Sequence, residues 1–234
     1  MNIVKEHIYF VNAHPDDLNA GLGLALILKD LAQYQLHIID FTKGERGLKE
    51  EGVGLDECAA IRIKEETSVC AELGVKPVFL REIDGDSFAC RETCNELAAV
   101  FRAEVPKAVI THWPLDIHQD HVMCAAATTK AIRLAEIQPE LYFYRQSMQS
   151  RHMPEDYFIP FGREIMDRKC ELLKLYACQK GEEIASRQRL ENTCNGIHNH
   201  VEFAECFAAW ALPLPGQPCF FEDLAKIRRK VCHQ

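Results

Sequence analysis

The chain has 234 residues, a formal net charge of −8 and a pI near 5.7. This length is sufficient for one sizeable α/β domain with a single hydrophobic core. The acidic balance argues against a polyanionic ligand, so nucleic acid is not expected as a partner. The short basic run at residues 226–230 is interpreted as the solvated face of a last helix.

The N-terminal segment has too short an apolar region for a signal peptide. No stretch approaches the ~20 apolar residues that a membrane span needs, so we expect a cytoplasmic protein without a membrane span. The eleven cysteines include no C-x-x-C pair, and we interpret them as reduced, mostly buried thiols. Self-association into a homo-oligomer is compatible with the sequence.

Apolar runs alternate with helical patterns at the intervals typical of βαβ units. Strands are predicted at 8–13, 36–41, 77–80, 108–111 and 141–144. The helices between them are predicted at 18–33, 56–73, 90–104 and 119–136. After residue 150 the pattern is weaker, and it predicts a strand at 157–161, a helix at 162–177 and an undefined tail.

These elements predict a Rossmann-like, doubly wound and mostly parallel sheet in a single domain, 1–234. Its core would be about 1–150, with a C-terminal addition at about 151–234. A strand order of 3-2-1-4-5 would make strands one and four neighbours at the topological switch point. Ligands of such sheets bind beyond the carboxyl ends of the strands at that point.

Two clusters of metal-ligand residues follow strands one and four. His14, Asp16 and Asp17 come directly after the first strand, and His118 and His121 follow the fourth. The predicted topology therefore brings both clusters to one place. Two imidazoles and one carboxylate, from His14, Asp17 and His121, would leave an open position, as in catalytic zinc sites.

The remaining groups of the two clusters suit acid–base chemistry. Asp16 is left over as a general base beside a metal-activated water. His118, one turn before His121, could stabilise an oxyanion as an imidazolium. A different interpretation is that Asp16 or Asp17 only caps the following helix, and that the two histidines are ordinary surface residues.

Other candidates carry less information. Arg62 and Glu65 are spaced either for an ion pair on a helix surface or for contact with an anionic or hydroxyl group of a substrate. His198 and His200 lack nearby residues that would complete a metal site. Glu205 is either a surface charge or a supporting group for the site. No glycine-rich phosphate loop follows the first strand, which disfavours NAD and ATP.

With these motifs, the chain resembles the LmbE-like, or PIG-L, family of zinc-dependent N-acetylglucosaminyl de-N-acetylases. The resemblance covers most of residues 8–210. The segments that carry it are 13–17, 42–47, 62–66 and 112–121, with a weaker match at 203–207.

The resemblance implies a Zn²⁺ cofactor and assigns roles to matching positions. It implies zinc ligands at His14, Asp17 and His121, a general base at Asp16, a group that steadies the tetrahedral intermediate at His118, and a substrate-contacting residue at Arg62. The chain departs from the family at Phe203, where relatives often carry tyrosine, and His200 is a candidate to replace that hydroxyl contact.

The function implied is removal of an acetyl group from a small molecule that contains N-acetylglucosamine. Its partner would be this N-acetylated amino-sugar substrate. A zinc amidohydrolase acting on a non-sugar amide, and a non-catalytic binding domain on the same fold, are the alternatives.

Overall fold

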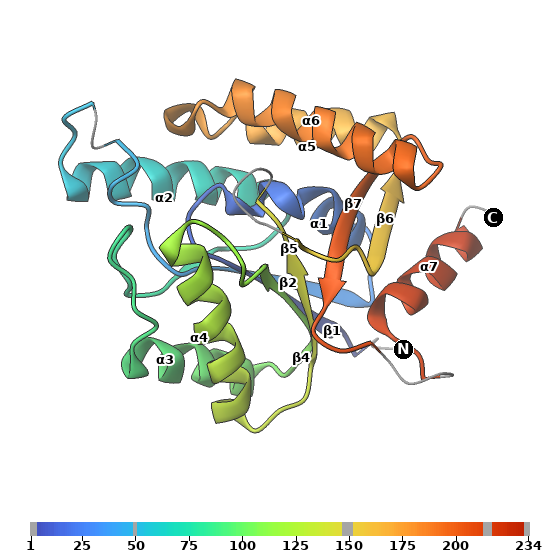
Figure 1. The fold of residues 1–234 in the computed structure, drawn as a ribbon, viewed down its shortest axis with the longest axis horizontal. Helices are drawn as coiled ribbons and strands as arrows, with labels where there is room; N and C mark the ends of the chain where they lie inside the picture. The colour runs from blue at the N-terminus through green and yellow to red at the C-terminus, as the bar shows by residue number, and fades with distance from the viewer. Residues whose placement is uncertain (1–3, 49–50, 147–151, 213–216, 232–234) are drawn as a thin grey trace.

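The fold is built on one seven-stranded mixed sheet with the strand order β3-β2-β1-β4-β5-β7-β6 (Figure 1). The computed structural model describes residues 4–48, 51–146, 152–212 and 217–231. The strands are β1 (Glu6–Asn12), β2 (Tyr34–Asp40), β3 (Val78–Phe79), β4 (Pro106–His112), β5 (Glu140–Tyr144), β6 (Tyr157–Phe161) and β7 (Phe203–Ala209). The first five pair in parallel, whereas β7 pairs antiparallel to both β5 and β6.

Helices cover both faces of this sheet. They are α1 (Leu22–Lys29), α2 (Leu55–Glu72), α3 (Arg91–Ala103), α4 (Gln119–Ala135), α5 (Arg163–Leu173), α6 (Gly181–His198) and α7 (Phe220–Val231), with short 3-10 turns η1 (Asp17–Ala20) and η2 (Ala177–Gln179). In Figure 1, α3 and α4 lie together on one side, and α1, α5 and α6 lie on the other.

The central strand β1 is buried on both faces, which explains its continuous apolar run. Ile8 and Phe10 belong to the core beneath α1, α2 and α5, whereas Tyr9 and Val11 belong to the core beneath α3 and α4. This alternation is the two-residue period of a strand. The predicted fold class is therefore confirmed. The order 3-2-1-4-5, on which the expected meeting of the two clusters depended, is also the one observed, with β7 and β6 added at the β5 edge.

The prediction of a single helix at 18–33 is wrong in detail. The chain instead forms the turn η1, breaks at Gly21 and restarts as α1. A side chain at Gly21 would come within 2.9 Å of the Phe10 ring, so glycine permits the close packing here. The carboxylate of Glu205 accepts hydrogen bonds from the amides of Gly23 and Leu24 (2.7 and 2.8 Å), and so caps the restarted helix.

The helix predicted at 162–177 ends at Leu173, and α6 was not predicted. The reason lies in the buried face of α6, which is apolar only near its start, at Ile184 and Ala185. The larger side chains buried along the rest of the helix are polar: Gln188, Asn192 and Asn195. Because the prediction relied on apolar periodicity, a helix with a polar buried face escaped it.

The helices and the cysteines bear on two expectations from the sequence. Among the described residues, no helix is long and apolar enough to cross a membrane. The ten cysteines in the described part of the chain are all unpaired, as the sequence predicted.

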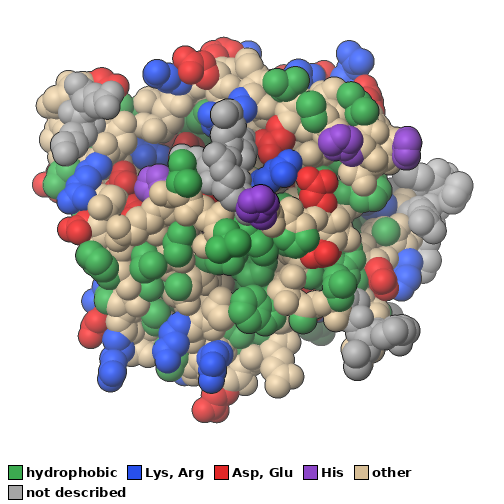
Figure 2. Space-filling view, viewed as in Figure 1, with side chains coloured by type: hydrophobic (Ala, Val, Ile, Leu, Met, Phe, Trp, Pro, Cys, Tyr) green, Lys and Arg blue, Asp and Glu red, His purple; other side chains and the backbone are tan. Residues whose placement is uncertain are grey.

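The outer face of α4 carries an apolar surface. Figure 2 shows hydrophobic side chains gathered over this region, with charged groups above them. A shallow hollow of about 380 Å³ lies here, lined by Pro114, Val122, Phe143 and Trp210 among others. Trp210 is 63% exposed. This apolar face is separate from the polar cavity described below.

The carboxyl end of β2 holds a buried acid whose charge the fold disfavours. One oxygen of Asp40 accepts a hydrogen bond from the Asn12 amide (3.2 Å), whereas the other has no partner among the described residues. Burial, and then the nearby Glu66, raise the pKa of Asp40 well above its usual value. The folded state therefore holds this proton at pH values where the unfolded chain has released it.

We expect Asp40→Asn to stabilise the protein relative to wild type at pH 8, and this advantage to shrink as the pH falls toward 4. The sign follows from linkage: a raised carboxyl pKa in the folded state makes wild-type stability decline as pH rises through that pKa. Urea unfolding of both proteins across this range measures the effect. Asp30→Asn, at an exposed position, is the control and should show no such trend. A pH-independent difference for Asp40→Asn would contradict the assignment.

Candidate metal centre

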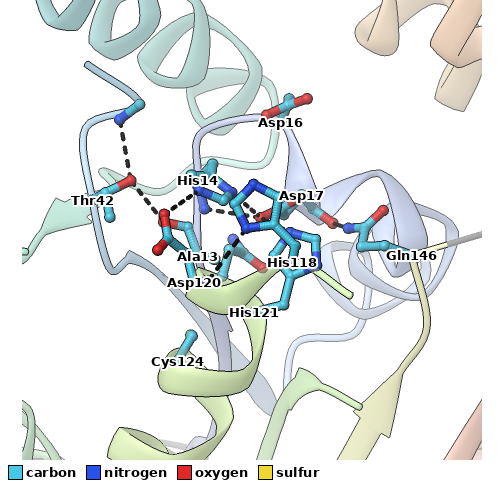
Figure 3. Close-up of polar contacts among 12 residues, drawn as sticks. Ala13, His14, Asp16, Asp17, Thr42, His118, Asp120, His121, Cys124 and Gln146 are labelled. Carbon is cyan, nitrogen blue, oxygen red and sulfur yellow. Dashed lines mark hydrogen bonds and ion pairs between the residues drawn. The ribbon is translucent and has the colours of Figure 1, made fainter. Parts of the chain in front are cut away.

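The two sequence clusters meet at the carboxyl ends of the neighbouring strands β1 and β4. Ligand atoms of His14, Asp17 and His121 all lie within 4.8 Å of one another. Asp17 Oδ2 is 3.1 Å from His14 Nδ1 and 3.6 Å from His121 Nε2. Figure 3 shows these three side chains together, with His118 beside them. The structure thus brings together the three residues predicted as metal ligands.

Neighbouring carboxylates fix both imidazoles. Asp120 Oδ2 lies 3.0 Å from His14 Nε2 and also accepts a hydrogen bond from the Gly85 amide at 2.6 Å. Asp116 Oδ2 lies 3.2 Å from His121 Nδ1, close enough for attraction although not aligned as a hydrogen bond. Carboxylates behind histidines are typical of metal sites, where they set the orientation of the ring.

The electrostatics of this cluster favour a cation. Burial opposes protonation of His14, yet its hydrogen bonds to Asp120 and Asp17 raise the pKa of the imidazole well above its usual value. Burial also opposes ionisation of Asp17, but the His121 and His112 imidazoles hold the pKa of its carboxyl well below its usual range. A site with ionised carboxylates around buried imidazoles suits a divalent ion of the zinc type.

The turn between His14 and Asp17 is not an ordinary helix cap. Asp16 has a φ of 102°, in the left-handed region, and its side chain makes no capping hydrogen bond. The carboxylate of Asp17 instead accepts a hydrogen bond from the His14 amide at 2.9 Å. The interpretation of these two acids as plain caps is therefore wrong for this chain.

Asp16 stands apart from the cluster (Figure 3) and contacts α2. The guanidinium of Arg62 donates hydrogen bonds to the Asp16 carboxylate and to the Pro15 carbonyl oxygen. One turn along, Glu66 accepts a hydrogen bond from the Asp16 amide at 3.3 Å. Burial raises the pKa of Asp16 to about 7 despite the opposing effect of Arg62.

This arrangement revises the interpretation of Arg62. Its side chain is 4% exposed and engages Asp16, although it still forms part of the cavity wall. It makes no ion pair with Glu65, whose carboxylate accepts hydrogen bonds from the amide and thiol of Cys178 (3.0 and 2.9 Å). Arg62 is thus placed to hold Asp16, a role that sequence spacing did not reveal.

His118 lies over the cluster, with its ring stacked on His121 at 4.6 Å. Its Nδ1 accepts a hydrogen bond from the Asp120 amide at 3.3 Å, which leaves the proton of a neutral ring on Nε2. Burial, together with His14 and His121, lowers the pKa of His118. The expected imidazolium is therefore disfavoured here, and the ring is a neutral donor.

One polar cavity of about 310 Å³ is lined by the predicted site residues His14, Asp16, Asp17, Arg62, His118 and His121. Its wall also includes groups that the sequence did not single out, from several elements: Asn19, Arg46, Asp84, Gln146, Gln179 and Arg187. A volume of this size is at the lower end of small-molecule sites. The polar wall suits a ligand rich in hydroxyl or amide groups.

Some predicted candidates lie elsewhere. Glu205 is buried and forms an ion pair with Lys169 at 2.7 Å, so it supports the fold rather than the site. Phe203 is buried in β7, and the exposed His198 and His200 are not part of the cavity wall. The sequence could have identified Asp120 as a site residue, since it lies inside the second cluster. It could not have identified Asp84, because no motif surrounds that residue.

Comparison with known proteins agrees with this geometry. A family described as GlcNAc-PI de-N-acetylase (PIG-L) matches residues 9–132, which include the candidate ligands from both strands. A 1D-myo-inositol 2-acetamido-2-deoxy-alpha-D-glucopyranoside deacetylase of Mycobacterium avium is 30% identical over 145 residues, 49% of this chain and 47% of that protein. The chain therefore spans about half the length of this curated relative.

Solved structures share the fold at low sequence identity. The N,N'-diacetylchitobiose deacetylase of Pyrococcus horikoshii has a TM-score of 0.75 and 22% identity, over 94% of this chain and 88% of the other. GalB, the 4-carboxy-2-hydroxymuconate hydratase of Pseudomonas putida, has a TM-score of 0.77 and 20% identity, over 92% and 100%. The sequence match and the shared fold lead to one conclusion: the chain belongs to the PIG-L (LmbE-like) family.

Proposed function

We propose that this protein is a metal-dependent hydrolase that removes the acetyl group from an N-acetylglucosamine-containing small molecule. The observation that carries the proposal is the cluster of His14, Asp17 and His121, which shares a polar cavity with a second carboxylate, Asp16. The deacetylase names among the relatives support the same reaction class.

The metal would be held by His14, Asp17 and His121, with zinc as the best match to two imidazoles and one carboxylate. Bound there, it would polarise the amide carbonyl and lower the pKa of a water molecule. Asp120 and Asp116, behind the two imidazoles, would keep the rings oriented.

Asp16 would act as the general base. A water between this carboxylate and the cluster would give up a proton to Asp16 as it attacks the amide carbonyl carbon. Asp16 would then return the proton to the leaving nitrogen, which departs as the free amine. A pKa raised toward neutrality suits a group that must both accept and release a proton.

His118 would stabilise the charge that develops on the carbonyl oxygen. Its Nε2–H is free to donate because Nδ1 already accepts the Asp120 amide. A fixed hydrogen-bond donor of this kind acts mainly in the transition state. This role needs no positive charge on the imidazole, in keeping with the lowered pKa of His118.

Two other functions remain distinguishable by experiment. The hydratase named above shares the fold, so fold similarity alone does not fix the reaction. Acetate release should be measured over N-acetylglucosamine conjugates and over simple N-acetylated amines. Release from the sugar conjugates is the expected result. Release only from non-sugar amides would favour the amidohydrolase alternative, and no release from any would favour a binding domain or another reaction.

The metal assignment predicts the behaviour of Asp17→Ala. Loss of this charged ligand should release the metal equivalent held at this site, while the fold is kept. Elemental analysis of the purified protein, with a thermal melt as the fold check, measures both. Asp16→Asn is the matched control, since Asp16 is not a ligand here and the metal should stay. A folded Asp17→Ala protein with the same metal content as wild type would refute the ligand set.

The base assignment predicts that Asp16→Asn, although it keeps its metal, loses about 10²–10⁴-fold in turnover. The change is nearly isosteric and leaves a group that can still contact Arg62. Initial rates of acetate release from an N-acetylglucosamine conjugate give the measurement. Turnover like that of wild type in the metal-loaded variant would exclude Asp16 as the base.

Arg62 should act through Asp16 rather than by binding substrate. We expect Arg62→Gln to lower kcat by about 10-fold or more, with a smaller change in KM. Arg187→Gln is the comparison, because this exposed arginine borders the same cavity and should affect KM instead. A change in KM alone for Arg62→Gln would restore the substrate-contacting role that the family resemblance implies.

A further inference from the structure

A second cluster of metal-ligand side chains lies at the other end of the central strands. His7 is near the start of β1, His37 lies on β2, and Glu104 follows the last residue of α3. Ligand atoms of these three residues also lie within 4.8 Å of one another. His7 and His14 are seven residues apart along an extended chain, which places the two clusters about 20 Å from each other.

The separations within this cluster fit one metal ion. His7 Nδ1 is 2.9 Å from His37 Nε2, and Glu104 Oε2 is 3.5 Å from His37 Nε2 and 3.9 Å from His7 Nδ1. Ligands at 2.0–2.1 Å around a tetrahedral zinc ion are about 3.3 Å apart. Small side-chain rotations would therefore bring all three atoms to ligand distance.

The cluster is built on rigid elements. His37 stacks on the Tyr9 ring at 4.2 Å, and Tyr9 is its direct partner in the pairing of β1 and β2. The Tyr9 hydroxyl donates a hydrogen bond to the Glu104 carbonyl oxygen at 2.9 Å. Tyr9 thus fixes one imidazole and the backbone of the carboxylate residue, so little ordering remains to be done on binding.

Partial exposure makes the cluster accessible to ions from solvent. The side chains of His7, His37 and Glu104 are 25%, 19% and 53% exposed. Three ligands then leave room for one water in the fourth position. The same exposure means that binding here should be weaker than at the buried centre.

We propose that His7, His37 and Glu104 form a second divalent-metal site, selective for zinc-type ions, that joins the start of β1 and the middle of β2 to the end of α3. Two imidazoles favour zinc, nickel or copper over magnesium and calcium, which prefer oxygen ligands. Nothing in the proposed hydrolysis uses this site, so it stands independently of the proposed function. The simpler description is a hydrogen-bonded pair of histidines with a nearby carboxylate and no metal affinity.

The test uses the full chain with Asp17→Ala, which removes one ligand of the candidate active centre and leaves His14, His118 and Asp120 the same in every protein compared. Calorimetric titration with ZnSO₄ should give one equivalent bound per chain. Adding His37→Gln to this background should abolish that equivalent, and adding His7→Gln should do the same. His198→Gln, at an exposed histidine on α6, is the matched control and should bind like its parent.

A second readout is the melting temperature of the same proteins. Binding to the folded state raises the melting temperature, so excess zinc should raise it for the parent and not for the His37→Gln variant. Magnesium should raise neither. Cys194→Ser in the parent checks for binding to the exposed thiol, and it should leave the titration unchanged.

Zinc binding that survives both His7→Gln and His37→Gln, or an Asp17→Ala parent that binds no zinc, would overturn the proposal. Neither result would decide the hydrolase proposal, whose metal site is tested by the fall in metal content from wild type to Asp17→Ala. Conversely, an inactive but zinc-binding Asp17→Ala protein is the outcome expected when both assignments hold.

Discussion

The turn after β1 is the constraint on which the rest of the site depends. Its geometry requires a left-handed conformation at Asp16, which costs a residue other than glycine on the order of 1–3 kcal/mol. Contacts from α2 offset this cost, since Arg62 binds the Pro15 carbonyl and the Asp16 carboxylate while Glu66 accepts the Asp16 amide. The turn separates two adjacent acids, directing Asp17 to the histidines and Asp16 to α2.

The C-terminal segment supports this turn from behind. Glu205 on β7 caps α1, and Lys169 on α5 neutralises its charge in a fully buried pair. Removing one member of such a pair typically costs 3–5 kcal/mol, because the other is left buried and uncompensated. Gln188 on α6 donates a hydrogen bond to Asn19 in the turn η1 at 2.9 Å. The added strands and helices therefore contribute to the position of the candidate metal centre.

The same fold holds two different kinds of chemistry among its structural relatives, a deacetylase and a hydratase. For this chain, the side chains themselves therefore have to supply the chemistry of hydrolysis. Three elements supply them: the turn after β1, the helix α2 and the start of α4. Side chains from each element line the same cavity, so they could act together on one substrate.

Much of this protein follows from its sequence. The alternation of apolar runs and helical patterns predicted the parallel core, because burial on both faces leaves a continuous apolar signature. The order of the strands was assumed from the fold class and was not read from the apolar pattern. The motifs at 13–17 and 118–121 predicted which side chains would meet, since the carboxyl ends of neighbouring parallel strands share one edge.

Only the tertiary structure decided the partners of those side chains. Asp84 approaches His14 from a loop that no local pattern marks, and Arg62 turned out to hold Asp16. Asp116 lies within the 112–121 motif, but its contact with His121 was not predicted. The helix α6 escaped prediction because much of its inner face is buried through hydrogen bonds of polar side chains, such as those of Gln188 and Asn192. Local periodicity reports the burial of apolar surface, whereas ion pairs and hydrogen bonds between distant segments depend on how the chain packs.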